Sequence, residues 1–358
     1  MEQYSFDLSS IGATAAVYDA FQPYDTRGLI LGRVSVVHRG QYLIFTSSGE
    51  ARAEAIGTLL YNAEDASELP AVGDWVAAQQ VGPAQAMVHA VLPRWTVFGR
   101  RAPGSRHEQQ VVAANIDLVF VVCGLDGDFN VRRIERYLTL ARESGAEAVV
   151  VLNKADLCDD LESRIAEVQR IAAESPVICV SAQTSEGVDP LKNFIASGQT
   201  VALLGSSGVG KSTIVNQLLG ENRQQVREVR ESDSRGRHTT THRELLPLPG
   251  GGALIDTPGM RELQLWAGQG SLDSAFSDIA ELADACRFRD CTHTVEDGCA
   301  VQAAIRDGSL DPERGESYQK LRAEVAFHGR KTDILAAQET KRRWKNVHKA
   351  MRGFYRGG

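Results

Sequence analysis

The chain has 358 residues, a formal net charge of −7 at pH 7 and an apolar content of 43%. This length suits about two or three domains of roughly 100–200 residues, and no stretch approaches the roughly 18 uninterrupted apolar residues of a membrane span. The N-terminus has no basic region followed by an apolar stretch, so it does not resemble a signal peptide. Without a secretion signal, six cysteines in a chain of this size argue against a disulfide framework. We therefore expect a cytoplasmic protein with reduced thiols and no membrane partner.

The first predicted region, residues 1–98, contains short segments in which apolar and polar residues alternate, separated by turns with glycine or proline. Period-two alternation at this spacing is typical of a small all-β barrel. The stretch 99–110 is polar, basic and turn-rich, and is predicted as a linker. The predicted strands are Leu29–Val37, Gln41–Thr46, Asp74–Ala78 and Ala86–Leu92.

The middle region, residues 111–266, alternates between apolar strands and helical patterns such as Arg132–Ser144. Continuous apolar strands that alternate with helices predict a parallel sheet covered by helices on both faces. Ligands bind to such sheets beyond the carboxyl ends of the strands. The strands predicted here are Ile116–Cys123, Ala148–Leu152, Val177–Val180, Val201–Leu204 and Ala253–Ile255.

A phosphate loop is predicted directly after the fourth of these strands. Gly205–Ser212 fits the pattern G-x-x-x-x-G-K-[ST], whose glycines let backbone N–H groups wrap phosphates at a helix N-terminus. We expect Lys211 to reach the β- and γ-phosphates and the Ser212 hydroxyl to bind Mg²⁺. The full set of expected phosphate-binding residues is Gly205, Ser206, Ser207, Gly208, Val209, Gly210, Lys211, Ser212 and Thr213.

Guanine recognition is predicted after the second strand, where Asn153, Lys154 and Asp156 form the pattern N-K-x-D. The Asp156 carboxylate can accept hydrogen bonds from N1–H and the 2-amino group of guanine. Adenine lacks both donors and would leave a buried carboxylate unpaired. Asn153 is expected to brace the loop. Ser181 and Ala182, after the third strand, offer the expected backbone donor for the guanine carbonyl.

A switch region is predicted around the last strand. Asp256 begins the pattern D-x-x-G and is expected to hold Mg²⁺ through water, while the Gly259 N–H senses the γ-phosphate; a plain turn is the alternative. One of Thr239, Thr240 and Thr241 is the candidate switch ligand for Mg²⁺, and we favour Thr240.

The attacking water has no obvious partner in the sequence. Met260 follows D-x-x-G and cannot orient water as the corresponding glutamine of Ras does, so we expect slow unassisted turnover. His238, beside the switch threonines, is a candidate replacement, although a loop histidine is more often simply exposed.

The motifs also occur in an unusual order, with the guanine motif first, the phosphate loop second and the metal-binding aspartate last. Ordinary small GTPases begin with the phosphate loop. A sheet whose site is built from loops tolerates such a permutation, because Asp189–Gln199 can join formerly free ends. We infer that the segment after Asp256 transmits the nucleotide state to the C-terminal region.

A metal site is predicted in the third region, residues 267–358. Three thiolates and one imidazole suit tetrahedral Zn²⁺, and four protein ligands leave no open position for catalysis. One structural zinc ion is therefore expected, with incidental loop cysteines as the alternative. The expected ligands are Cys286, Cys291, His293 and Cys299.

The C-terminal stretch is strongly basic. From Arg330 onward the basic residues are opposed only by Asp333 and Glu339, which indicates contact with a polyanion or, alternatively, a solvated helical face. Apolar residues recur among them as in an amphipathic helix, which could bind RNA phosphates or pack on the zinc module. They are Trp344, Val347, Met351 and Phe354.

These motifs together resemble the RsgA (YjeQ) family of circularly permuted GTPases, and Val72–Val76 and Gly236–Thr241 extend the resemblance. It implies a multidomain fold: an N-terminal barrel of the OB type, a central α/β P-loop GTPase with a parallel sheet, and an α-rich zinc-binding domain. It also implies bound GTP or GDP with Mg²⁺, and late maturation of the small ribosomal subunit through its rRNA, with GTP hydrolysis stimulated by that subunit. We expect a monomer.

Two other classes of protein share parts of this pattern. A GTP-dependent metal-delivery protein would use the cysteine cluster as a cargo site, so its zinc would exchange with the nucleotide state. A non-enzymatic scaffold would bind GTP without hydrolysing it, but the intact Lys211, Ser212 and Asp256 argue against that class.

Overall fold

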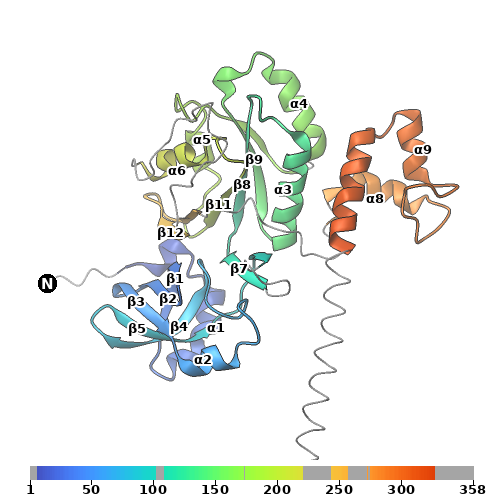
Figure 1. Ribbon diagram of the computed structural model, residues 1–358. Helices are drawn as coiled ribbons and strands as arrows, with labels where there is room; N and C mark the ends of the chain where they lie inside the picture. The colour runs from blue at the N-terminus through green and yellow to red at the C-terminus, as the bar shows by residue number, and fades with distance from the viewer. Residues whose placement is uncertain are drawn as a thin grey trace, which may run out of the picture. The chain divides into compact units, whose positions relative to one another are not determined.

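The computed structural model describes residues 6–101, 109–172, 174–220, 243–256, 272 and 275–326. The chain divides into two compact units, Met1–Gln264 and Leu265–Gly358 (Figure 1). Among the described residues, no helix is both long enough and apolar enough to cross a membrane.

The first unit begins with a closed barrel. Its strands pair in the order β1-β2-β3-β5-β4, and a further β1–β4 pairing closes the ring. The β3–β5 pairing is parallel and the others are antiparallel, and α2 (Gly57–Asn62) lies between β3 and β4 in the chain. The predicted OB-type barrel is thus confirmed. Its strands are β1 (Ile30–His38), β2 (Gln41–Thr46), β3 (Gly49–Ala55), β4 (Trp75–Gly82) and β5 (Gln85–Val91).

Strand β3 is a barrel strand that the sequence did not predict. Ala51, Ala53 and Ala55 point into the barrel and are buried, while the charged residues between them are exposed. Alanine is a weak strand former, so this alternation carried little signal. The larger core residues come from the other strands, namely Val34, Tyr42, Ile44, Val76 and Val88.

The ends of the segment predicted as a linker are paired strands. Strands β6 (Val97–Arg101) and β7 (Gln109–Ala114) form a two-stranded antiparallel sheet, in which Phe98 pairs with Ala113. Both of these residues are buried, so apolar contact favours pairing at this end. Residues 102–108 lie outside the described part of the chain.

The middle region forms the predicted α/β sheet, in the order β10-β9-β8-β11-β13-β12. All neighbouring pairs are parallel except β12–β13. Figure 1 shows α3 and α4 on one side of the strands and α5 and α6 on the other. The strands are β8 (Leu118–Gly124), β9 (Glu147–Asn153), β10 (Val177–Cys179), β11 (Thr200–Leu204), β12 (Glu244–Pro247) and β13 (Ala253–Asp256). The helices are α3 (Val131–Ser144), α4 (Leu161–Ala172), α5 (Asp189–Lys192) and α6 (Lys211–Leu219).

Strand β12, which the sequence also did not predict, connects the barrel to this sheet. It pairs with β13 on one side and meets β1 at Val36 and Glu244 on the other. The β-structure therefore runs without interruption from the barrel into the α/β sheet. Two further helices precede the barrel strands, η1 (Leu8–Ile11) and α1 (Ala15–Asp25).

A buried arginine reinforces this junction. The Arg33 guanidinium donates hydrogen bonds to the carbonyls of Ile11, Gly73 (3.3 Å) and Asn115 (3.2 Å) and to Oγ1 of Thr200 (2.7 Å). Burial lowers the pKa of Arg33 to about 10, against the opposing effect of nearby carboxylates. The side chain stays charged at neutral pH. Its N–H groups donate hydrogen bonds to the barrel region and to the α/β region of this unit.

The second unit is α-rich, as expected. It contains α8 (Ser277–Asp284), α9 (Ala300–Asp307) and a helix over residues 312–326. Phe276 and Tyr318 meet edge to face with ring centroids 5.4 Å apart, and Arg314 pairs with Asp278 at 2.6 Å. The basic stretch predicted as a C-terminal helix begins after the last described residue.

Candidate nucleotide site and metal centre

The predicted phosphate loop connects the carboxyl end of β11 to the first turn of α6. Nζ of Lys211 donates hydrogen bonds to the carbonyls of Gly205 (2.8 Å) and Ser206 (2.5 Å), which places the ammonium within the turn of the loop. Gly210 has a φ of 93°, and a Cβ there would lie 2.2 Å from Nδ2 of Asn153. Only glycine allows this close approach of the loop to the predicted guanine motif.

Asn153 ties three loops together at the end of β9. The residue is 2% exposed. Its Nδ2 donates to the Val209 carbonyl at 2.6 Å, and its Oδ1 accepts a hydrogen bond from the Ala182 amide at 2.9 Å. The loops after β9, β10 and β11, far apart in the sequence, therefore meet at one amide group. These contacts fit the bracing role predicted for Asn153, and its part in nucleotide binding stays a prediction.

The other residues of the guanine motif are less enclosed. Asp156, in η2 (Ala155–Leu157), is exposed, whereas specificity based on a buried carboxylate was expected. Lys154 has a φ of 65°, in the left-handed region. The Ser181 amide donates to the Glu186 carbonyl, so the amides of Ser181 and Ala182 are both engaged within the protein. Their donation to a guanine carbonyl stays a prediction.

Of the residues predicted for the switch, the structure describes only Asp256. Asp256 ends β13, whose Ile255 lies beside Ala202 of β11, so its carboxylate is at the same edge of the sheet as the phosphate loop. The other predicted residues of this group lie outside the described residues, namely His238, Thr239, Thr240, Thr241, Gly259 and Met260.

Sequence reasoning missed one loop of this site, between β8 and α3. It carries Asp126 and Asp128, whose carboxylates contact Lys154 and Ser206 of the predicted nucleotide motifs. Arg133, in the first turn of α3, contacts both Asp128 and Ser206. The available signal was positional, because this loop follows a buried strand at the edge of the sheet where ligands bind.

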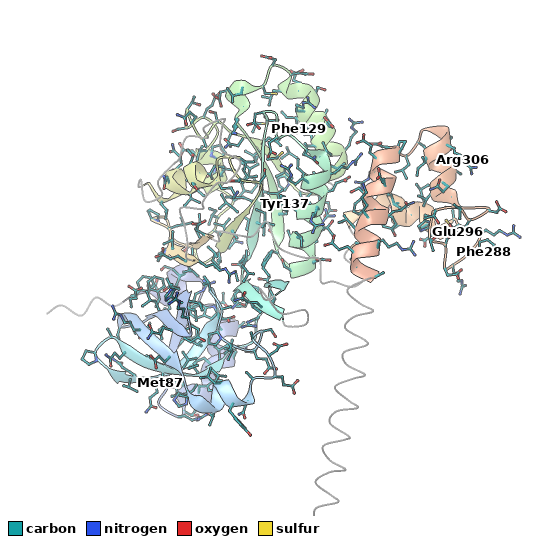
Figure 2. The ribbon with its side chains drawn as sticks, viewed as in Figure 1. Met87, Phe129, Tyr137, Phe288, Glu296 and Arg306 are labelled. Atoms are coloured by element: carbon teal, nitrogen blue, oxygen red, sulfur yellow. The ribbon has the colours of Figure 1, made fainter. Side chains whose placement is uncertain are left out.

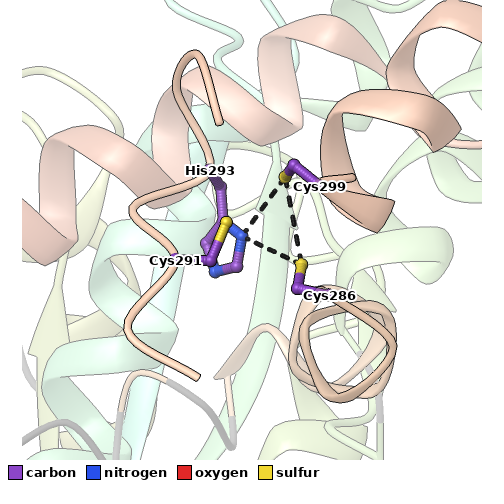
Figure 3. A group of neighbouring side chains, drawn as sticks. All are labelled: Cys286, Cys291, His293 and Cys299. Atoms are coloured by element: carbon purple, nitrogen blue, oxygen red, sulfur yellow. Dashed lines mark hydrogen bonds between the residues drawn. The ribbon is translucent and has the colours of Figure 1, made fainter. Parts of the chain in front are cut away.

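The predicted metal ligands cluster in the second unit (Figure 3). The ligand atoms of Cys286, Cys291, His293 and Cys299 all lie within 4.8 Å of one another. Sγ of Cys286 and Sγ of Cys299 are 3.9 Å apart, and each lies 3.6 Å from Nδ1 of His293. Bond lengths to tetrahedral Zn²⁺ imply about 3.8 Å between sulfurs and about 3.6 Å between sulfur and nitrogen. The donor set and its spacing fit this ion.

Surrounding groups hold these four side chains in place. The amides of Ala300 and Gln302 donate to Sγ of Cys286 (3.3 Å) and of Cys299 (3.4 Å). The His293 carbonyl accepts hydrogen bonds from Nε2 of Gln302 (2.8 Å) and of Gln319 (2.6 Å). N–H donation to thiolates and clamping of the ligand backbone are typical of a structural metal site.

An acidic side chain orders the loop that carries two of these ligands. Figure 2 shows Glu296 on this loop. Its carboxylate accepts hydrogen bonds from Thr292 and from the amides of Thr294 (2.9 Å) and Val295 (3.1 Å). These bonds, those from Thr292 above all, hold the pKa of Glu296 well below its usual range. The loop is therefore fixed by contacts of its own as well as by the ligand side chains.

Comparison with known proteins identifies relatives over most of the chain. The model of the RsgA GTPase family matches residues 91–266. The small ribosomal subunit biogenesis GTPase RsgA of Opitutus terrae is 48% identical over 96% of this chain and 97% of its own. A second relative of that name, RsgA 2 of Lactiplantibacillus plantarum, is 46% identical over 91% of each chain.

Solved structures show the same likeness. YjeQ from Thermotoga maritima is 25% identical with a TM-score of 0.61, over 83% of this chain and 99% of its own. YloQ, a circularly permuted GTPase, shares the fold at 22% identity, with a TM-score of 0.57 over 83% of this chain and 95% of its own. In this chain, too, the guanine motif after β9 precedes the phosphate loop after β11. The chain therefore belongs to the RsgA GTPase family and is a circularly permuted, GTP-hydrolysing enzyme.

Proposed function

We propose that this enzyme binds the small ribosomal subunit, assists its late maturation and hydrolyses GTP to GDP and phosphate when the subunit stimulates it. Three relatives that are 42–48% identical to this chain carry small ribosomal subunit biogenesis in their names. The observation that carries the nucleotide part of the proposal is a pair of hydrogen bonds at Asn153, which donates to the Val209 carbonyl and accepts from the Ala182 amide. They join the predicted base-binding and phosphate-binding loops into one site.

In this site, Lys211 binds the β- and γ-phosphates, and Asp156 accepts hydrogen bonds from the guanine base. Ser212 holds Mg²⁺ directly, and Asp256 does so through water. When bound, the ion neutralises charge that develops on the transferred phosphoryl group. Thr240 and Gly259 complete the proposed switch.

Turnover without the subunit is slow in this proposal, because Met260 has no polar group with which to orient the attacking water. Either His238 or a group of the subunit supplies that function. Stimulation by a large RNA-rich partner therefore acts on the step that the isolated chain performs poorly.

The remaining parts bind the partner in this proposal. The chain works as a cytoplasmic monomer in which residues 1–98 form the OB-type domain, 111–266 the GTPase and 267–358 the zinc domain. Residues 99–110 connect the first two, and the ends of this connection belong to the paired strands β6 and β7. OB-type barrels bind nucleic acid through one sheet face and its loops. The basic stretch after Arg330 offers further charge for rRNA.

One structural Zn²⁺ ion is bound by Cys286, Cys291, His293 and Cys299. Three of these side chains are buried, and amide donors engage two of the sulfurs. A cargo site that releases its metal needs ligands that open readily, so this enclosure argues against metal delivery.

The test is GTP turnover by the purified protein with and without small ribosomal subunits, across a salt series. We expect slow turnover alone and strong stimulation that fades as salt rises, because contacts with RNA phosphates release counterions. Lys211→Ala is the inactive control. Stimulation that is absent at every salt concentration, while the protein still binds GTP, would refute the role of the subunit.

A further inference from the structure

The loop between β8 and α3, here called the acidic loop (Leu125–Asn130), is fixed at both ends. The Leu125 amide donates to the Asn153 carbonyl at 2.8 Å. The Asn130 side chain caps α3 by accepting a hydrogen bond from the Arg133 amide at 2.9 Å. Phe129, labelled in Figure 2, lies under the Arg164 guanidinium of α4 at 4.7 Å. The loop is thus attached to β9, α3 and α4.

On its phosphate-loop side, the acidic loop holds Ser206. Oδ2 of Asp128 accepts hydrogen bonds from the Ser206 hydroxyl and from Nη1 of Arg133 at 2.7 Å. The same Nη1 donates to Oγ of Ser206 at 2.9 Å, which closes a triangle of polar contacts. Ser206 is 6% exposed, so its hydroxyl faces the interior of the protein and not bulk solvent.

On its base side, the acidic loop holds Lys154 of the guanine motif. Oδ2 of Asp126 accepts a hydrogen bond from Nζ of Lys154 at 2.5 Å. Oδ1 of the same carboxylate accepts one from the Asp128 amide at 3.2 Å, so the two aspartates are also joined to each other. A Cβ at Gly124 would lie 2.6 Å from this Oδ1, and a side chain there would displace the carboxylate.

Both carboxylates keep their charge near neutral pH. Burial alone would raise the pKa of Asp128, but the Ser206 hydroxyl and Arg133 hold it below its usual value. Burial would also raise the pKa of Asp126, but Lys154 and backbone amides of the loop together lower it. Each negative charge therefore faces a cation of the protein, which limits its repulsion of nucleotide phosphates.

We propose that the acidic loop positions both halves of the nucleotide site, the phosphate loop through Asp128 and Ser206 and the base-binding loop through Asp126 and Lys154. The inference rests on the nucleotide site proposed above. These aspartates are positioning residues, because they act on nucleotide through other side chains. A loop that holds both motifs fixes their positions relative to each other, and a nucleotide that bridges them depends on those positions.

The test compares the affinities of the full chain for GDP and GMP by calorimetry. GMP lacks the β-phosphate that the phosphate loop binds. Asp128→Ala and Ser206→Ala should each lower the affinity for GDP about five- to tenfold, which is the range for partly exposed, charge-assisted hydrogen bonds. The affinity for GMP should fall less than about twofold. The double variant should bind GDP as well as the weaker-binding of the two single variants does, because both substitutions remove the same contact between Asp128 and Ser206. Asp126→Ala should weaken GDP and GMP by the same factor.

Matched controls separate positioning from folding and charge. Asp189→Ala removes a carboxylate whose side chain is 88% exposed and pairs with Lys192, so both affinities should stay unchanged. Ser206→Thr keeps the hydroxyl and should retain most of the affinity for GDP. If Asp128→Ala does not fold, Asp128→Asn, which removes the charge but keeps the size of the side chain, takes its place beside Ser206→Ala.

Several outcomes would overturn the proposal. One is a double variant whose loss of GDP affinity equals the sum of the losses of the two single variants. Another is an Asp128→Ala variant that loses as much affinity for GMP as for GDP, or that binds GDP more tightly because Arg133 is released. The last is an unchanged affinity for both nucleotides in all variants. A wild-type protein that binds neither nucleotide would instead refute the proposed nucleotide site. Wild-type binding that Lys211→Ala abolishes, combined with unaffected acidic-loop variants, would refute the positioning role alone.

Discussion

Replacing Asn153 by alanine removes the contact on which the assembly of the site depends most. The change deletes the hydrogen bonds to Val209 (2.6 Å) and from Ala182 (2.9 Å), and both of these residues are buried. A buried polar group left without a partner costs about 1–3 kcal/mol, so the two groups together predict a loss of about 2–6 kcal/mol in the free energy of unfolding. Water that enters the polar gap would bring the loss towards the lower end of this range.

The assay is urea unfolding followed by circular dichroism, with and without GDP. At a GDP concentration about 100-fold above the dissociation constant, the free energy of unfolding of the wild-type protein should rise by about 2.7 kcal/mol. That of Asn153→Ala should rise by less than half of this at the same concentration. Asn193→Ala, an exposed asparagine at the end of α5, is the matched control and should change stability by less than about 0.5 kcal/mol. The reasoning fails if Asn153→Ala matches that control in stability and in GDP binding.

Three further predictions follow from the same geometry. Asp156→Asn should shift the preference from guanine towards xanthine nucleotides, measured by competition binding, and an unaltered preference would contradict its role with the base. Removing zinc with a chelator, or changing Cys299 to alanine, should unfold the second unit but leave GDP affinity within about twofold, because the two sites belong to different compact units. In the folded protein the pKa of Asp128 lies below its ordinary value of 3.8. The charged carboxylate therefore makes its full contribution to stability above pH 3.8, and this contribution is lost only as the pH falls through the lower, folded-state pKa. The ratio of GDP affinities between wild type and Asp128→Ala should therefore stay constant from about pH 5.5 to 8, and a ratio that changes across this range would contradict the assignment.

Local patterns in the sequence were sufficient for the parts of the fold that repeat a simple period. The apolar runs of β8, β9 and β11 and the helical spacing in α3 lie where the sequence predicts them. Strand β3 was missed because its inward residues are alanines, and β12 because only Leu245 and Leu246 of its four residues are buried. Short strands of this kind are stabilised by their neighbours and not by their own composition.

The same distinction applies to the site. The phosphate loop and the metal ligands have fixed spacing along the chain, so their residue types could be recognised directly. The contact of Asp128 with Ser206 joins residues 78 positions apart, and the hydrogen bond from Arg33 to Thr200 spans 167. No local period encodes such pairs, because they arise only when the sheet brings strand ends and barrel together. The exposure of Asp156 likewise depends on which loops surround it.

The most direct test of the account is a calorimetric titration of the full-length, zinc-loaded protein with GDP and with ADP. The loops after β9, β10 and β11 meet at Asn153, and we propose that they form one guanine-specific site. We therefore predict binding of GDP at one site, abolished in Lys211→Ala, and binding of ADP weaker by at least about 100-fold. Folded protein that binds neither nucleotide, or that binds ADP as tightly as GDP, would contradict it.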